Sequence, residues 1–264
     1  MKMKTKLEPQ LQYYDISPRV TAFSCTRHGG VSEGNYASFN VNAYCGDDPE
    51  HIAQNRRALC KLLHIKPDRL IMPHQVHGTG VTQISKTFFL LNDDIRRTAL
   101  EGIDALITNV PGVCIGVSTA DCIPIIIYDP EYHAAGVVHS GWRGTVANIA
   151  YATVAAMTMA YHSRPESLLA VIGPGISRRN FEVGDDVYEP FAAAGYPMDA
   201  IAERMDKWHI DLPNCCRLQL ESAGIPSANI RLTDICTYEH TDVFFSARRL
   251  GTSSGRILTG IVLR

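Results

Sequence analysis

The sequence has little net charge, no long uninterrupted hydrophobic run and none of the cysteine spacings of a structural zinc site. Among its 264 residues, 25 Lys and Arg stand against 27 Asp and Glu, so the net charge of -2 gives no general attraction for nucleic acid or anionic lipid. The most apolar stretches, residues 110–128 and 151–161, are interrupted by Asp121 or are too short to cross a bilayer. We therefore expect a small-molecule partner, with no nucleic acid and no membrane contact.

The sequence also lacks the features of a secreted protein. The basic residues at its start are not followed by the apolar run of a signal peptide. Its eight cysteines include no Cys-x-x-Cys pair, and a chain of this length buries enough surface to fold without disulfide bonds. We therefore expect free thiols and a cytoplasmic location.

Strand and helix patterns alternate irregularly along the chain. Strand patterns cover residues 20–26, 69–73, 113–117, 123–128, 134–138, 169–172 and 256–263, and helical patterns cover residues 48–64, 146–162, 185–194 and 211–224. Several connections between strands are too short for a parallel crossover, which favours mixed sheets and the α+β class. No repeat or Pro/Ser-rich linker divides the chain, so we expect one domain over residues 1–264.

Three candidate metal ligands, His77, Cys122 and His139, each lie at the end of a predicted strand. Loops at strand ends commonly build functional sites on open sheets. Two imidazoles and a thiolate leave a fourth tetrahedral position on zinc for water, whose pKa the metal lowers toward about 7. Spacing alone leaves His74 and His133 as rival ligands, and it equally allows Cys122 to be a buried core thiol.

Asp121 is a second candidate catalytic residue, because it stands directly beside Cys122. A carboxylate in this position can act as a general base or as a hydrogen-bond partner of a metal ligand. It can equally cap the turn that precedes Pro124. The sequence does not choose between these roles.

Two groups of residues are candidates for holding an anion. Residues 141–144, Gly-Trp-Arg-Gly, begin a predicted helix, and the backbone amides with the Arg143 guanidinium suit phosphate or carboxylate; the alternative is a tight turn with a packed Trp. A basic cluster near the C-terminus, Arg248, Arg249 and Arg256, either closes salt bridges or meets an anionic substrate.

A set of short motifs, taken together and in order, resembles one protein family. The motifs are Thr26–Ser32, Phe39–Asn40, Gly46–Pro49 with Asn55–Arg56, Gln75–Gly78, Asp104–Leu106, Ala120–Pro124, His139–Gly144, Ile172–Ile176 and Phe244–Arg249. They resemble the YfiH-like family, also known as multicopper polyphenol oxidase or laccase-domain proteins. The likeness runs from about Phe23 to the C-terminus, which leaves residues 1–18 as an N-terminal extension.

The resemblance implies a fold and a ligand set. The fold is a four-layer αββα sandwich, described as related to cysteine hydrolases of the cytotoxic necrotizing factor type. The implied metal ligands are His77, Cys122 and His139. One departure is visible, because Asn40-Val41-Asn42 replaces the usual Asn-Leu-Gly and a His is replaced near Tyr44-Cys45. This departure bears on the substrate contacts near that loop and leaves the three ligands untouched.

The resemblance also implies an activity. The expectation that we adopt is a zinc-dependent purine nucleoside enzyme that phosphorolyses adenosine, inosine and methylthioadenosine to free base and ribose 1-phosphate, and that also deaminates adenosine with an activated water. Phosphate contacts are then expected from Arg27, Asn40 and Arg143. Copper-dependent phenol oxidation, and hence copper, ranks low because the chain contains no His-x-His motif.

The alternative activity is a cytoplasmic amidase that edits peptidoglycan precursors. It fits either metal-activated water or Cys122 as a nucleophile, and these are competing uses of one thiolate. A metal-storing or interaction protein leaves the open coordination position unexplained. The oligomeric state stays open, with a homodimer as one option.

Overall fold

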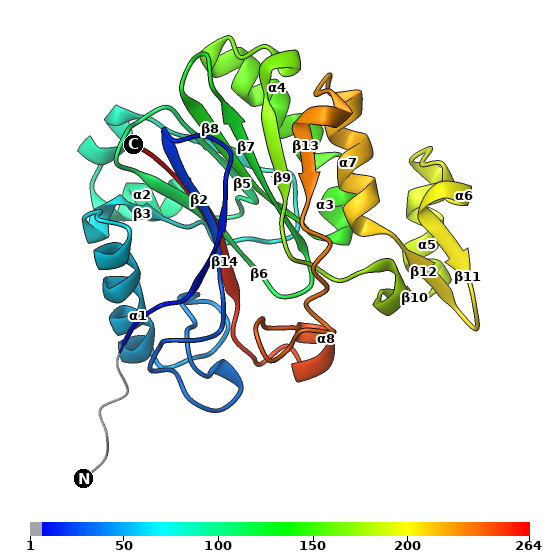
Figure 1. The fold of residues 1–264 in the computed structure, drawn as a ribbon, viewed down its shortest axis with the longest axis horizontal. Helices are drawn as coiled ribbons and strands as arrows, with labels where there is room; N and C mark the ends of the chain where they lie inside the picture. Colours follow the sequence, from blue (N-terminus) through cyan, green and yellow to red (C-terminus); the bar gives the residue numbers. More distant parts are fainter. Residues whose placement is uncertain (1–6) are drawn as a thin grey trace.

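The computed structural model describes residues 7–264, whose strands form two large sheets and one small one (Figure 1). The first sheet contains, in spatial order, β1 (Leu11–Tyr14), β2 (Val20–Cys25), β14 (Ile257–Leu263), β6 (Cys114–Thr119) and β3 (Leu70–Ile71). The second contains β13 (Ile230–Leu232), β9 (Leu169–Ile172), β7 (Ile123–Asp129), β8 (Ala134–Ser140), β5 (Ala105–Thr108) and β4 (Val81–Ile84). The small sheet contains β10 (Glu182–Val183), β12 (Trp208–Ile210) and β11 (Ala202–Arg204).

The helices lie mainly outside the two large sheets (Figure 1). They are α1 (Pro49–Leu62), α2 (Asp93–Ala99), α3 (Trp142–Val146), α4 (Ile149–Tyr161), α5 (Asp185–Ala193), α6 (Met198–Ile201), α7 (Leu212–Ser222) and α8 (Ala247–Leu250). Single 3₁₀ turns cover Gly34–Tyr36, Pro67–Arg69, Lys86–Leu90, Pro165–Ser167, Arg178–Asn180 and Ser227–Asn229. Among the described residues, no helix combines the length and apolarity that a membrane crossing requires.

Both large sheets are mixed. The β4–β5, β9–β13 and β3–β6 pairs are parallel, whereas β7 pairs antiparallel with β8 and β9, and β14 pairs antiparallel with β2 and β6. The short β7–β8 connection is an antiparallel hairpin and could not hold a parallel crossover. The α+β class with mixed sheets is therefore confirmed.

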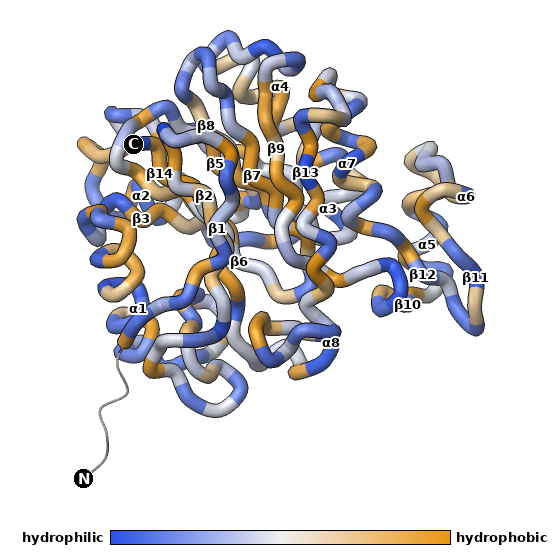
Figure 2. The backbone as a smooth tube through the Cα atoms, viewed as in Figure 1, coloured by the Kyte–Doolittle hydropathy of each residue, from blue (hydrophilic) through white to orange (hydrophobic). Residues whose placement is uncertain are grey.

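Alternating side chains on the central strands bind the layers together. On β7, Ile125 and Ile127 pack with residues of α4 and α7, whereas Ile126 and Tyr128 pack with the first sheet. A third cluster joins the outer face of the first sheet to α1 through Leu59. These contacts give the order helix, sheet, sheet, helix. Figure 2 shows that hydrophobic residues are concentrated on central strands such as β7 and β9.

Most of the expected elements form near the predicted bounds. The helix after Asp48 begins at Pro49, and the Asp48 side chain accepts a hydrogen bond from the Glu50 amide. The helix expected over residues 146–162 is instead interrupted at Asn148, whose φ of 60° lies in the left-handed region, so that α3 and α4 are separate.

The segment expected to be an N-terminal extension contributes to the sheet. Within residues 1–18, β1 pairs along its whole length with β2, so it is the edge strand of the first sheet. Residues 1–6 lie outside the described part of the chain. Residues 11–14 of the expected extension therefore form part of the first sheet.

Candidate metal centre

The three expected ligands converge because of the register of the second sheet. The β7–β8 pairing places Pro124 opposite His139, so Cys122, which precedes β7, lies beside the end of β8. His77 reaches the same point from the segment His74–Gly78, where its φ of 62° turns the chain sharply. The ligand atoms of His77, Cys122 and His139 all lie within 4.8 Å of one another.

This donor set fits zinc. Two imidazoles and one thiolate match the tetrahedral zinc sites that keep one position open, and soft thiolate excludes Mg²⁺ and Ca²⁺. His139 is buried, Cys122 is half-buried and His77 is exposed, so the cluster meets solvent on the His77 side. Among residues 7–264, this is the only group of three or more His, Cys, Asp or Glu side chains close enough to hold a metal ion.

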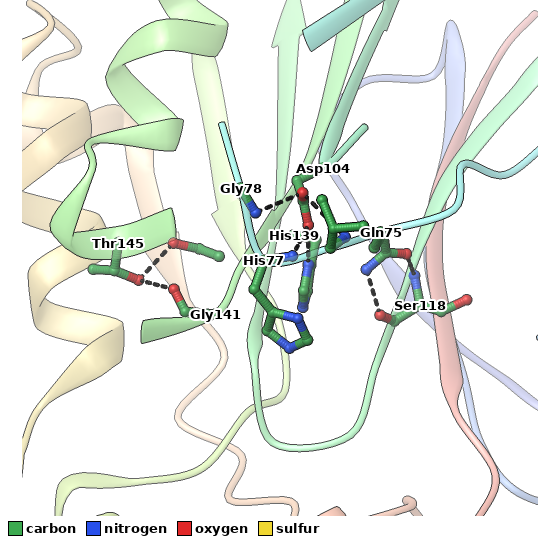
Figure 3. A network of polar contacts seen from close by, with 10 residues as sticks. Gln75, His77, Gly78, Asp104, Ser118, His139, Gly141 and Thr145 are labelled. Carbon is green, nitrogen blue, oxygen red and sulfur yellow. Dashed lines mark hydrogen bonds and ion pairs between the residues drawn. The ribbon is translucent and has the colours of Figure 1, made fainter. Parts of the chain in front are cut away.

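A buried carboxylate, Asp104, holds two of the ligands in place (Figure 3). Its Oδ1 accepts from His139 Nδ1 at 2.7 Å and from the His77 amide at 2.9 Å, and its Oδ2 accepts from the Gly78 amide at 2.7 Å. Because Nδ1 is held by the carboxylate, Nε2 is the ring nitrogen of His139 that is left for a metal. Asp104 stands in one of the ordered motifs without an expected role; the signal in the sequence was a charged residue directly before the apolar residues 105–107.

The segment that carries His77 is also fixed to the first sheet. The Gln75 side-chain amide donates to the Ser118 carbonyl at 2.8 Å, and its oxygen accepts from the Ser118 amide at 2.7 Å (Figure 3). This pair of bonds ties the segment to the C-terminal end of β6. His77 is thus positioned by both large sheets.

The cluster changes the acidity of its own members. Burial, the largest influence, raises the pKa of the Cys122 thiol, but the charges and hydrogen bonds of His139 and His77 outweigh it and lower this pKa to about 6. Burial lowers the pKa of His139, but Cys122 and Asp104 outweigh it and raise this pKa to about 9. By contrast, burial raises the pKa of the Cys60 thiol to about 11. All eight cysteines are free, and Cys122 alone among those with a resolved shift favours the thiolate.

A glycine permits the close approach of the ligands. A Cβ atom on Gly141 would lie 2.6 Å from His77 Cδ2 and 3.2 Å from Cys122 Sγ. A residue with a Cβ atom fits at this position only if one of the two ligands moves. Gly141 is therefore required by the packing of the metal centre.

The rival histidines lie elsewhere. His74 Nδ1 bonds Glu101 Oε1 at 2.6 Å, and the His74 ring stacks on Tyr44. His133 bonds Tyr128 and the carbonyl of Arg264. Neither histidine belongs to the ligand cluster.

The metal centre opens into a cavity of about 590 Å³. Its lining includes the three ligands, Asp121, the aromatic side chains Tyr44 and Phe181, and two arginines, Arg248 and Arg256. A volume in this range suits a ligand of nucleoside size. The Arg248 guanidinium donates to the Glu182 carbonyl, and the Arg256 guanidinium donates to the carbonyls of residues 252, 254 and 255. Because these acceptors are neutral, they do not neutralise the positive charges that the two side chains bring to the cavity.

The residues expected to bind phosphate from the resemblance do not line this cavity. Arg27 donates to the carbonyls of Ala37 and Thr241 and lies over the Phe245 ring. Asn40 is fully buried and accepts from the Arg256 amide at 3.1 Å. Arg143 is exposed on α3, with its guanidinium over the Trp142 ring.

Asp121 lines the cavity, but its carboxylate is already engaged. Oδ1 accepts from Thr237 Oγ1 at 2.7 Å, and Oδ2 accepts from the Arg248 amide at 2.7 Å. The residue takes a φ of 86°, which turns the chain between β6 and β7. Asp121 therefore connects the Cys122 turn to the start of α8.

Comparison with known proteins gives one consistent family. A family model described as multi-copper polyphenol oxidoreductase laccase matches residues 21–264. A purine nucleoside phosphorylase from Bacteroides thetaiotaomicron is 43% identical over 264 residues, which is 98% of this chain and 98% of that protein. A protein named adenosine deaminase RL5, from an unknown prokaryotic organism, is 42% identical over 246 residues, covering 92% of this chain and 93% of its own.

The fold agrees with the sequence likeness. The crystal structure of YlmD from Geobacillus stearothermophilus superposes with a TM-score of 0.88 at 31% identity, covering 95% of this chain and 94% of that chain. The resemblance drawn from the ordered motifs is thereby confirmed. The chain belongs to the multi-copper polyphenol oxidoreductase laccase family, which is the YfiH-like family of the motifs.

Proposed function

We propose that this protein is a zinc-dependent purine nucleoside enzyme of the cytoplasm. It cleaves adenosine, inosine and methylthioadenosine with phosphate, giving the free base and ribose 1-phosphate or its methylthio analogue, and it also deaminates adenosine. The observation that carries the proposal is the three-ligand cluster at the wall of a nucleoside-sized cavity. The names of two relatives that are 43% and 42% identical, a purine nucleoside phosphorylase and an adenosine deaminase, support both activities.

The two reactions make different demands on the site. When bound, zinc supplies a Lewis acid that makes water a better nucleophile at neutral pH. Deamination consumes one water molecule, replaces the C6 amino group of adenine by oxygen and releases ammonia, so it needs no phosphate. Phosphorolysis forms a bond between a phosphate oxygen and C1′ of the ribose and breaks the bond from C1′ to N9. It therefore needs a second place that holds an anion.

We assign the phosphate contact to Arg248 and Arg256. Both line the cavity, and the hydrogen bonds that their guanidinium groups make within residues 7–264 go to uncharged oxygens, so they attract a dianion and can donate charge-assisted hydrogen bonds to it. Asp121 holds the Arg248 amide and Asn40 holds the Arg256 amide. Asp121 and Asn40 are thus positioning residues for the two arginines.

Arg27 holds the segment that precedes Arg248 in the chain. Its guanidinium holds the Thr241 carbonyl, and its own amide donates to the Val243 carbonyl at 2.8 Å. These bonds fix the chain that leads into α8. In this proposal Arg27 acts through the segment and Arg143 takes no part in binding phosphate.

A multicopper oxidase is not supported by the ligand inventory. That chemistry needs several copper sites and hence many histidines, whereas residues 7–264 hold a single three-ligand group. The family description therefore names a reaction that needs more ligand groups than the one found within residues 7–264.

The amidase remains the second candidate, because Cys122 lies between His77 and His139 and favours the thiolate. A thiolate beside imidazole is the arrangement of cysteine nucleophiles. The same thiolate cannot serve fully as ligand and nucleophile at once. Product analysis distinguishes these uses.

The test is mass spectrometry of products after purified protein is offered adenosine or inosine, with and without phosphate, and separately a muramoyl-peptide precursor. We expect inosine cleavage to stop without phosphate while adenosine is still converted to inosine. Release of base that is independent of phosphate, or cleavage of the peptide precursor alone, contradicts the proposal.

Substitution of the arginines tests the phosphate assignment. Arg248→Ala and Arg256→Ala should each weaken phosphorolysis by about 2 kcal/mol more than deamination, because a hydrogen bond to a charged group is lost. Arg97→Ala, on the exposed face of α2, is the control. If Arg27→Ala or Arg143→Ala is instead the variant that loses phosphorolysis selectively, the phosphate contact belongs to that arginine and not to Arg248 and Arg256.

A further inference from the structure

Tyr44 presents an open aromatic face at the cavity. Its ring stacks on the His74 ring with a centroid distance of 4.1 Å and an interplanar angle of 24°. Tyr44 is nevertheless 55% exposed, and both rings line the cavity. One face of the Tyr44 ring is covered by His74, so the exposure belongs largely to the rest of the ring.

Three hydrogen bonds hold His74, the residue on which Tyr44 stacks. His74 Nδ1 bonds Glu101 Oε1 at 2.6 Å, the His74 amide donates to the Leu100 carbonyl at 2.9 Å, and the His74 carbonyl accepts from the Ile103 amide at 3.2 Å. The first of these bonds fixes the His74 ring and the other two fix its backbone, so the ring loses little further freedom when another ring packs on Tyr44. The stack is therefore preorganised.

The loop that carries Tyr44 is also tied down. The Tyr44 amide donates to Asn42 Oδ1 at 2.6 Å, and Tyr36 Oη donates to the Cys45 carbonyl at 2.9 Å. Asn40 Nδ2 in turn donates to the Asn42 carbonyl at 3.2 Å. These bonds hold the backbone of residues 42–45 in place beside the cavity.

The stack and the metal centre share one segment. His74 and the ligand His77 are three residues apart, and Gln75 between them is clamped to β6. A planar group on Tyr44 therefore lies in the cavity that also holds the ligands. Deamination takes place on the base itself, so it would bring the base into this same cavity.

From these contacts we propose that Tyr44 is the platform on which the purine base stacks, with His74 as its fixed support. The inference rests on the proposed function, which it deepens by naming a residue that determines the aromatic specificity of the site. Planar heteroaromatic bases gain from stacking on an aromatic ring, whereas a sugar phosphate without a base does not. Tyr44 thus recognises the base and leaves the ribose and phosphate to other residues.

The experiment compares Tyr44→Ala and Tyr44→Phe with the wild-type holoenzyme. Isothermal titration calorimetry measures the Kd of adenine and, separately, of ribose 1-phosphate, and steady-state kinetics give KM and kcat for adenosine. We expect Tyr44→Ala to raise the adenine Kd and the adenosine KM about tenfold, with ribose 1-phosphate binding and metal content unchanged. Tyr44→Phe keeps the ring and should keep wild-type values. Tyr151→Ala, at a tyrosine of similar exposure on α4 outside the cavity lining, is the matched control.

Each other outcome overturns the inference in a recognisable way. An unchanged adenine Kd in Tyr44→Ala, while the wild type still cleaves nucleosides, removes the platform and leaves the proposed function intact. If Tyr44→Ala weakens ribose 1-phosphate binding as much as adenine binding, the substitution has disturbed the loop and has not removed a specific contact with the base. Equal weakening in Tyr44→Phe assigns the contact to the hydroxyl and not to the ring. A wild-type protein that neither cleaves nucleosides nor binds adenine refutes the proposed function, and the platform with it.

Discussion

Replacement of Asp104 by Asn tests whether this carboxylate organises the metal centre. The substitution keeps the shape of the side chain but turns one acceptor oxygen into an NH₂ donor. Oδ1 faces His139 Nδ1 and the His77 amide, and Oδ2 faces the Gly78 amide, so the NH₂ group meets an N–H donor in either orientation. No rotamer of Asn satisfies the site.

The size of the effect follows from these contacts. Losing about two hydrogen bonds to a charged, fully buried acceptor costs about 3 kcal/mol of unfolding free energy, or about 6 to 12 °C in Tm for a chain of this length. The His139 ring also loses the partner that fixes its orientation. Partners of this kind typically contribute 10- to 100-fold to metal affinity, so we expect zinc to bind about 10- to 100-fold more weakly.

The assay combines zinc titration against a competing chelator with thermal unfolding of the metal-free protein. Asp129→Asn is the matched control, because Asp129 is equally buried at the other end of β7 and accepts from the amides of Glu131 and Tyr132 through one oxygen only. An Asn there can keep both bonds. Wild-type zinc affinity in Asp104→Asn, or an equal loss in Asp129→Asn, would refute the role of Asp104.

The remaining predictions concern the ligands. Cys122→Ser should lose most of the roughly one zinc per chain, whereas Cys114→Ser, in the buried core, should keep it; equal loss by elemental analysis removes the reason for choosing Cys122. In chelator-treated protein, the Cys122 pKa of about 6 means that the thiolate dominates above that pH, so alkylation by iodoacetamide should rise between about pH 5 and 7 and then level off; a rise only near pH 9 contradicts the shift. Gly141→Ala should lower zinc affinity at least about tenfold, since its Cβ would displace His77, and unchanged affinity would show that the loop yields freely.

The local pattern of the sequence determined much of the fold. Capping at Asp48 and the apolar spacing behind it specify α1, and the runs of β-branched residues specify β6, β7 and β8, because these signals act within one helix turn or along one strand. The strand patterns also placed His77, Cys122 and His139 at strand ends, and the ordered motifs selected them as ligands. Spacing alone, however, left His74 and His133 as equal candidates.

The tertiary structure decided what depends on contacts between distant segments. The pairing of Pro124 with His139 sets which side chains meet at the sheet edge, and it depends on register across strands, which no local pattern fixes. The role of Asp104 and the presence of Arg248 and Arg256 in the cavity likewise depend on where separate segments cross. Hydrogen-bonding partners of a charged side chain are chosen by proximity in space, so a sequence can show that the charge is present but only the packed chain shows what it meets.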